Sequence, residues 1–128
     1  MKITTFNPMI ISKDSESIIS IFEALGFEKK HVKKELGDGT VTDVRMCNAD
    51  GFHVDVVQMD AVPQDITQIR MNVDDFDEAF ELLTAHGFKN VQRDKISESA
   101  TSKGTGMVSP SGFMIALSHH FKKEEKGE

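Results

Sequence analysis

The chain has 128 residues, with 15 Lys and Arg against 21 Asp and Glu, and a formal net charge of −6. This length suits one compact domain or two small fused repeats, and the acidic balance argues against a nucleic-acid binder. The single cysteine, Cys47, excludes an internal disulfide, no apolar run could span a bilayer, and no signal-peptide pattern is present, so we expect a cytoplasmic protein.

The first half of the chain is expected to form a strand, a helix and three further strands. An amphipathic pattern of apolar residues at helical spacing starts after Asp14, a residue suited to cap a helix, and ends before Gly26. The expected strands are Thr4–Ile11, Lys29–Glu35, Val41–Cys47 and Phe52–Gln58. A linker, Asp60–Asp65, follows them.

The second half predicts the same order of elements. A strand, Ile66–Val73, precedes a helix that is capped by Asp75 and ends before Gly87. The remaining expected elements are strands at Asn90–Ile96, around Met107–Ser109 and at Phe113–Ser118, a polar loop at Ser97–Gly106 and a charged tail at 122–128.

The two halves match at a constant offset of 61 residues. Gly26-Phe27 returns as Gly87-Phe88, Gly51-Phe52 as Gly112-Phe113, and Met46 as Met107. Several matches at one ungapped offset indicate an internal repeat of about 60 residues.

This doubled order resembles the vicinal oxygen chelate superfamily, which includes glyoxalase I, bleomycin-resistance proteins and extradiol dioxygenases. The residues that carry the resemblance are Leu25-Gly26-Phe27 and the closing SPSGF segment from Ser109. The resemblance implies an α+β fold of two tandem βαβββ units, about 3–59 and 66–121, that form a cupped mixed sheet with the helices on its outer face. Two fused ferredoxin-like units are the alternative.

Strand alternation predicts which side chains face away from the helices and line a cavity. These are Asn7, Met9, Arg45, Cys47, His53, Asp55, Gln68, Arg70, Met114 and Ala116. From this set we predict ligand contacts by Asn7, Arg45, His53, Asp55, Gln68, Arg70 and Met114. A shift of one residue in the first strand would replace Asn7 by Phe6.

The resemblance also implies four positions where metal-using members carry ligands. Here they are Asn7 (or Phe6), Asp55, Gln68 and Ala116. Because Ala116 has no ligand atom and none of the four is histidine, we predict no metal centre of this type and no other cofactor. His120, at the end of the last strand, is an extra candidate ligand, although His119-His120 also fits a solvated strand end.

Asp55 and His53 are the candidates for catalysis. A carboxylate among valines needs a partner if it is enclosed, and Arg45 or Arg70 could supply a purely structural salt bridge. Alternatively, Asp55 anchors a cationic ligand or acts as a general base, and His53, two residues away, could transfer a proton.

The resulting functional hypothesis is a small-molecule-binding protein of the bleomycin-resistance type that lacks the intact metal centre and pairs as a homodimer. The alternative is a divalent-metal-dependent lyase, isomerase or dioxygenase of the same superfamily with atypical ligands. A regulatory or partner-binding domain is a third interpretation. The sequence has no Trp and no Tyr, which weakens the drug-binding interpretation because such sites commonly stack their ligand on aromatic rings.

Overall fold

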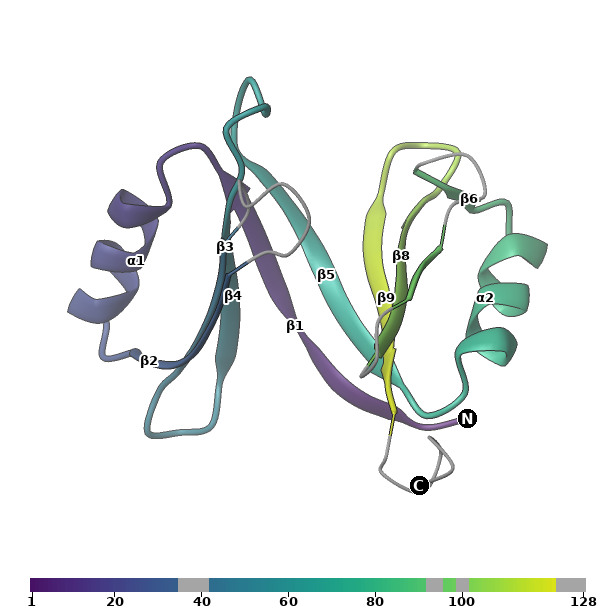
Figure 1. Cartoon of the computed structure of the whole chain (residues 1–128), viewed down its shortest axis with the longest axis horizontal. Helices are drawn as coiled ribbons and strands as arrows, with labels where there is room; N and C mark the ends of the chain where they lie inside the picture. Colours follow the sequence, from purple (N-terminus) through teal and green to yellow (C-terminus); the bar gives the residue numbers. More distant parts are fainter. Residues whose placement is uncertain (35–41, 92–95, 99–101, 122–128) are drawn as a thin grey trace. The chain divides into compact units, whose positions relative to one another are not determined.

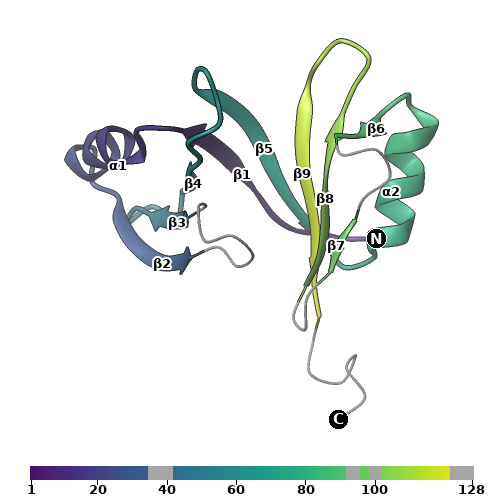
Figure 2. The same ribbon diagram turned by 45° about the horizontal axis from the view of Figure 1, so that its top comes forward.

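The computed structural model describes residues 1–34, 42–91, 96–98 and 102–121 of the chain. It divides into two compact units, which are treated separately below. The first unit is Asn7–Thr67, and the second unit combines Met1–Phe6 with Gln68–Glu128. Each unit contains one helix and a sheet, as Figures 1 and 2 show. No helix among the described residues is long and apolar enough to cross a membrane.

The first unit has the order strand, helix, three strands. Its elements are β1 (Ile3–Ser12, which begins in the second unit), α1 (Ser15–Ala24), β2 (Glu28–Lys34), β3 (Thr42–Cys47) and β4 (His53–Gln58). The strands lie in the order β2-β3-β4-β1. The pair β1–β4 is parallel and the other two pairs are antiparallel, so α1 connects β1 to the far edge of the sheet.

The second unit has the same order of strand, helix and three strands, with one additional short strand. Its elements are β5 (Ile66–Val73), α2 (Phe76–Ala85), β6 (Lys89–Asn90), β7 (Ser97–Glu98), β8 (Ser102–Val108) and β9 (Met114–His120). The strands lie in the order β5-β9-β8-β6, and β7 also pairs with β8. The pair β5–β9 is parallel, as β1–β4 is in the first unit.

Strand registers in the two units coincide at the offset of 61 residues. In the parallel pairs, Met9 lies opposite Asp55 in the first unit and Arg70 lies opposite Ala116 in the second. The antiparallel pairs give the same correspondence. Arg45 lies opposite Asp55 in the first unit, and Gly106 lies opposite Ala116 in the second. Likewise, Glu28 lies opposite Cys47, and Lys89 lies opposite Val108. The correspondence therefore extends from residue types to backbone pairing.

The predicted helix boundaries are confirmed. The Asp14 side chain accepts a hydrogen bond from the Ser17 backbone N–H, and the Asp75 side chain accepts one from the Glu78 N–H at 3.1 Å. Both bonds satisfy amides that have no partner within the first helical turn. Gly87 follows α2 with φ of +94°, a conformation that costs little only for glycine.

Each helix covers an apolar face of its own sheet. In the first unit Ile19 packs with Val44, Met46, Val54 and Val56. The corresponding cluster of the second unit contains Met71, Val73, Phe76, Ala79, Met107, Ile115 and Leu117. Burying these side chains against the sheets is the main stabilising term for both helices, which are too short to be stable alone.

The prediction of a polar loop at Ser97–Gly106 is wrong where the structure describes it, because Ser97–Glu98 forms β7 and Ser102–Val108 forms β8, which pairs antiparallel with β9. Residues 99–101 lie outside the described residues. The small polar residues of β8 carry no strand pattern. They suit close packing instead, since a Cβ added to Gly104 would lie 3.1 Å from both the Leu117 carbonyl oxygen and Ser118 Oγ. Pairing with a neighbouring strand thus outweighs weak intrinsic propensity.

Two other expectations fall partly outside the described residues. The strand expected at Asn90–Ile96 is observed only as β6, Lys89–Asn90, and residues 92–95 are not among those described. The charged tail at 122–128 also lies outside them.

Candidate functional site

The first unit carries a polar surface on the sheet face opposite α1. Because Val44, Met46, Val54 and Val56 pack with the helix, the alternate residues of β3 and β4 point to the other face. This opposite face, which we call the site face, carries Asn7, Met9, Arg45, Cys47, His53 and Asp55. Four of the predicted ligand contacts, Asn7, Arg45, His53 and Asp55, are therefore brought together.

Asp55 is the centre of the site face, and its side chain is fully buried. The Asn7 side-chain Nδ2 donates to Asp55 Oδ1 at 2.9 Å and to the Pro8 carbonyl oxygen at 2.8 Å. Since both neighbours are acceptors, the orientation of the Asn7 amide is fixed. Phe6, the alternative residue for this position, is 63% exposed, so the site-face residue is Asn7.

Fixing the amide in this way leaves Asn7 Oδ1 buried with no hydrogen-bond partner among the described residues. Asn7 itself is only 5% exposed. A buried polar atom without a partner is costly, and in native proteins it often marks a place that water, an ion or a ligand satisfies. Asn7 therefore presents a buried amide oxygen that a hydrogen-bond donor could satisfy.

Arg45 lies directly opposite Asp55 across the β3–β4 pair. The two side chains nevertheless form no ion pair, and Arg45 has no hydrogen-bond partner among the described residues. A salt bridge between Arg45 and Asp55 is thus not what holds the buried carboxylate. The half-buried guanidinium keeps its donors available.

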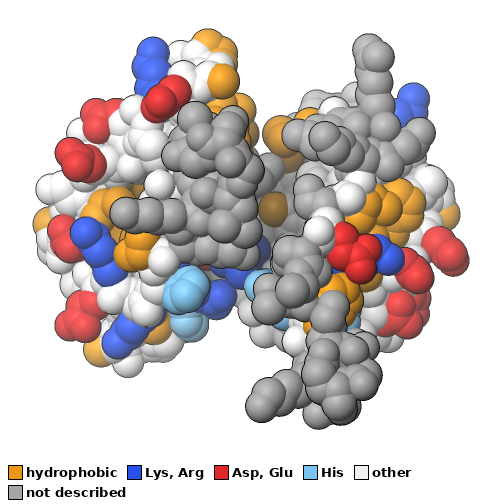
Figure 3. Space-filling model, viewed as in Figure 1, with side chains coloured by type: hydrophobic (Ala, Val, Ile, Leu, Met, Phe, Trp, Pro, Cys, Tyr) orange, Lys and Arg blue, Asp and Glu red, His pale blue; other side chains and the backbone are white. Residues whose placement is uncertain are grey.

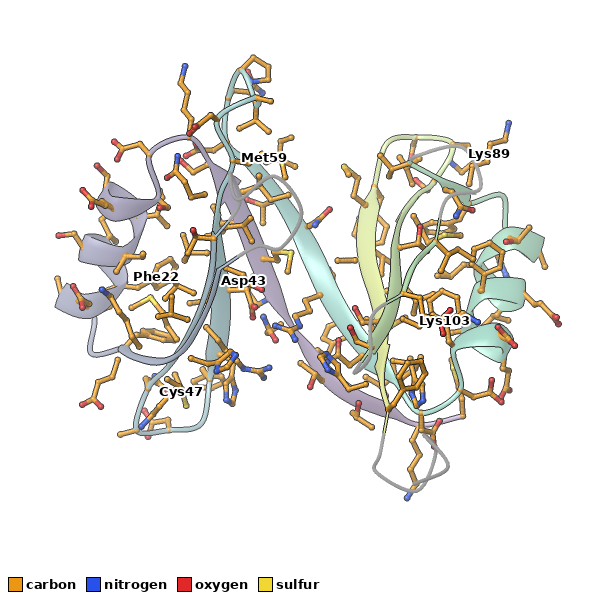
Figure 4. The ribbon with its side chains drawn as sticks, in the orientation of Figure 1. Phe22, Asp43, Cys47, Met59, Lys89 and Lys103 are labelled. Atoms are coloured by element: carbon orange, nitrogen blue, oxygen red, sulfur yellow. The ribbon has the colours of Figure 1, made fainter. Side chains whose placement is uncertain are left out.

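His53 and Cys47 form the next cross-strand pair on the site face. Both are half-buried, and the Cys47 Sγ donates to the Asn48 carbonyl oxygen at 3.3 Å. Figure 4 shows nitrogen-bearing side chains beside the labelled Cys47, at one end of the sheet. The imidazole of His53 is thus accessible at the polar end of the face.

The other end of the site face is apolar. Ile11, Val57 and Val62 form a buried cluster, with Met9, Met59 and Ile66 packed against it. The site face therefore has a polar end around Asp55 and an apolar end rich in methionine, a division that is typical of sites for small organic molecules.

The remaining predicted residues belong to the second unit. Gln68 is buried at 8% exposure, whereas Arg70, Met114 and Ala116 are half-buried. Arg70 lies opposite Ala116 in the register of β5 and β9. Their predicted roles in ligand or metal binding stay predictions.

The two adjacent histidines at the end of β9 differ sharply in burial. His120 is exposed, whereas His119 is buried at 9% exposure, and its Nδ1 lies 2.8 Å from the Val73 carbonyl oxygen. The expectation that both lie at a solvated strand end is therefore wrong for His119. It fixes the end of β5 to β9 instead.

Strand alternation places Asn72 on the same face as Gln68 and Arg70, although it is not among the predicted ligand contacts. It is only 6% exposed, and its Oδ1 has no hydrogen-bond partner among the described residues. The second unit thus has a buried unsatisfied amide oxygen of its own.

A surface hollow of the second unit, about 210 Å³ in volume, is a weaker candidate site. Three aspartates line it, and each already has a partner: Asp74 accepts from the Lys2 N–H at 2.6 Å, Asp75 caps α2, and Asp77 pairs with Lys103 at 3.3 Å. The hydrogen bond from Lys2 lowers the pKa of Asp74. These groups serve the local structure.

The donor set does not fit a metal centre of the superfamily type. Asn7 and Asp55 offer only amide and carboxylate oxygen atoms, and Asp55 Oδ1 is already hydrogen-bonded. Ala116 contributes no donor. Among the described residues, no three His, Cys, Asp or Glu side chains are grouped so that they could hold a metal ion.

Known structures identify the fold. The chain aligns with methylmalonyl-CoA epimerase from Mycobacterium tuberculosis at a TM-score of 0.70 and 16% identity, covering 96% of this chain and 92% of that one. A glyoxalase/bleomycin resistance protein/dioxygenase superfamily member from Vibrio splendidus 12B01 gives 0.62 and 17%, covering 94% and 100%. A glyoxalase I variant from Zea mays gives 0.66 and 14%, covering 93% of this chain but only 44% of the maize chain.

No protein-family model matches the sequence, and no curated protein matches it. At these identities the structural likeness establishes the fold alone. The α+β fold class predicted from the sequence is confirmed, and the chain has the vicinal oxygen chelate fold.

Proposed function

We propose, from the premise that the chain has the vicinal oxygen chelate fold, that it binds a small organic molecule on the site face of the first unit. The observation that carries this proposal is the buried Asn7–Asp55 pair, in which Asn7 Oδ1 has no partner among the described residues. In this proposal the protein is a binder of the bleomycin-resistance type without the superfamily's metal centre.

The chemistry of the site face indicates what such a ligand must offer. Asn7 Oδ1 needs a donor, so the ligand carries an N–H or O–H group that reaches this buried amide. The apolar end around Ile11, Val57 and Met9 would cover the carbon part of the same molecule. Gln68, Arg70 and Met114 remain predicted contacts of the second unit.

A second candidate function is supported by the same unsatisfied oxygen. Amide and carboxylate oxygens are the donors that hard divalent cations prefer, and Asn7 and Asp55 provide one of each. The protein would then be a divalent-metal-dependent lyase, isomerase or dioxygenase with atypical ligands. Asp55 and His53 would be the candidates for proton transfer.

Thermal unfolding of protein stripped with a chelator separates these candidates. Wild type is screened against a library of small organic compounds, first without metal and then with Zn²⁺, Ni²⁺, Mn²⁺ or Fe²⁺. The same screen is run on Asp55→Asn, which keeps the size of the side chain but removes its charge. Asp50→Asn is the matched control, because Asp50 is an exposed acid in the turn before β4.

The proposal expects compounds that raise the melting temperature without metal, an effect that Asp55→Asn abolishes and Asp50→Asn preserves. Stabilisation that requires a metal and disappears in Asp55→Asn would favour the enzyme. If Asp55→Asn and Asp50→Asn are both still stabilised, the compounds do not bind at the site face, and both candidate functions are contradicted.

We further propose that the chain pairs as a homodimer, that it acts in the cytoplasm, and that its two units descend from one duplicated unit. The coincident strand registers support the duplication. Phe52 and Phe113, at matching positions, are 66% and 51% exposed, which is consistent with burial in a partner chain. Light scattering after size-exclusion chromatography would give twice the chain mass of 14.3 kDa for a homodimer.

A further inference from the structure

A register shift (β-bulge) between β2 and β3 places the side chain of His31 beside the polar end of the site face, where Arg45 and His53 also lie. The register of β2 and β3 shifts between Lys29 and His31, and His31 then lies opposite Arg45. Without the extra residue, Lys30 would lie opposite Arg45 and place two permanent cations side by side. Bulges commonly redirect a side chain next to a functional site.

The described part of the second unit gives a partial comparison for this register shift. At the position matching Arg45 it has Gly106, whose carbonyl oxygen accepts a hydrogen bond from the Val91 N–H at 2.8 Å. Val91 matches Lys30 at the offset of 61 residues, and residues 92–95, which match 31–34, lie outside the described residues.

His31, Arg45 and His53 therefore share the polar end of the site face. His31 is directly opposite Arg45, and His53 belongs to the neighbouring cross-strand pair with Cys47. Side chains directly opposite have Cβ atoms roughly 5 Å apart, and diagonal neighbours are within reach of long side chains. Figure 3 shows histidine atoms at the lower edge of the part that carries β2, β3 and β4, with Lys and Arg atoms beside them.

No ion pair is found between Arg45 or His53 and the acids Asp43 and Asp55 of β3 and β4 within the described part of the chain. Asp55 is fully buried and accepts a hydrogen bond from Asn7, and Glu28 lies 3.9 Å from Lys30 Nζ. Arg45 and His53 have no ion pair or hydrogen bond among the described residues. A half-buried guanidinium with unused donors is well suited to bind two oxygen atoms of a carboxylate or phosphate.

We propose that His31, Arg45 and His53 form a subsite for the anionic group, carboxylate or phosphate, of the molecule bound on the site face. This rests on the proposed function and adds the class of ligand: a small organic acid or phosphate ester with an apolar part. In this arrangement the guanidinium of Arg45 binds the anion, and the two imidazoles flank it. Arg45 supplies the permanent positive charge of this subsite, in a chain whose formal net charge is −6.

Titration calorimetry with inorganic phosphate and with malonate, at constant ionic strength, tests the subsite directly. We expect both probes to bind wild type, or one of them to bind at least tenfold more tightly, which would identify the anion. Arg45→Gln should weaken binding tenfold or more, and Arg45→Lys should fall between, because lysine keeps the charge but loses the planar pair of donors. Lys89→Gln, which removes an exposed cation of the second unit, should change binding less than twofold.

Folding of each variant is checked by its melting temperature without ligand, and His53→Ala provides a second, smaller perturbation that should also weaken anion binding. Equal affinity of wild type and Arg45→Gln, or no binding of either anion by wild type, overturns the subsite. If organic compounds still stabilise the protein through Asp55 in that case, the proposed function survives alone. Anion binding at Arg45 without any such compound would leave the subsite standing and contradict the broader function.

Discussion

Gln58, the last residue of β4, holds the junction between β1 and α1, and we expect its loss to destabilise the first unit. Its Oε1 accepts a hydrogen bond from the Ser15 N–H at 2.9 Å. Its Nε2 donates to the Lys13 carbonyl oxygen and to Asp60 Oδ1, both at 2.8 Å. Ser15 is the first residue of α1 and is only 9% exposed, so water cannot fully replace the lost acceptor.

The size of the effect follows from these three bonds. A typical hydrogen bond contributes a net ~0.5–1.5 kcal/mol, with exposed bonds at the lower end. The two bonds of Gln58 Nε2 are exposed and the bond to Ser15 is partly buried. Gln58→Ala should therefore lower the free energy of unfolding by about 2.5 kcal/mol. With an m-value of about 2 kcal/mol/M in urea, the midpoint should fall by roughly 1 M.

Equilibrium unfolding in urea, followed by circular dichroism, measures this shift. Gln64→Ala is the matched control, because Gln64 is exposed and has no hydrogen bond among the described residues. Gln58→Glu should also destabilise the unit, because its carboxylate keeps an acceptor for Ser15 but replaces the donor that faces the Lys13 carbonyl oxygen and the Asp60 carboxylate. A midpoint for Gln58→Ala equal to that of Gln64→Ala would refute the assignment of Gln58 as the residue that holds this junction.

Two further predictions concern the second unit. Met107 is completely buried in the core of this unit, so Met107→Ala should lower the free energy of unfolding by roughly 2–5 kcal/mol. Met114 is half-buried, so Met114→Ala should lower it clearly less. Similar losses of stability in thermal unfolding of the two variants would contradict the core assignment. The hydrogen bond from the Lys2 N–H lowers the pKa of Asp74 below its usual 3.8, so its contribution to stability is present above pH 3.8 and is lost as the pH falls through the lowered value. Asp74→Asn should reduce stability at pH 7 and flatten its decrease below pH 4, and an unchanged pH profile in urea unfolding would disprove this coupling.

Local signals in the sequence were sufficient for the order of elements. Asp14 and Asp75 mark the helix starts because a side-chain oxygen can satisfy a free amide within three residues, without help from distant parts of the chain. The alternation of β4 likewise placed Val54 and Val56 on the helix face and His53 and Asp55 on the other. Periodicity is a property of the segment itself, so these predictions held.

Contacts between distant segments decided two features that no local sequence pattern indicates: the strand β8 and the burial of His119. The segment Ser102–Val108 is a strand because β9 offers it a complete ladder, although its own residues are small and polar. His119 is buried because its partner, the Val73 carbonyl oxygen, is 46 residues away in the chain. No pattern within either segment carries that information.

The candidate site divides in the same way. The sequence by itself predicted that Arg45, His53 and Asp55 share a face, because strand parity follows from the helix-facing residues, but it left Asn7 and Phe6 as alternatives on the first strand. Only the tertiary structure decided that Asn7 donates to Asp55, that Arg45 does not pair with it, and that a bulge sets His31 opposite Arg45. These depend on register and on competition among partners from different strands, which a linear pattern does not encode.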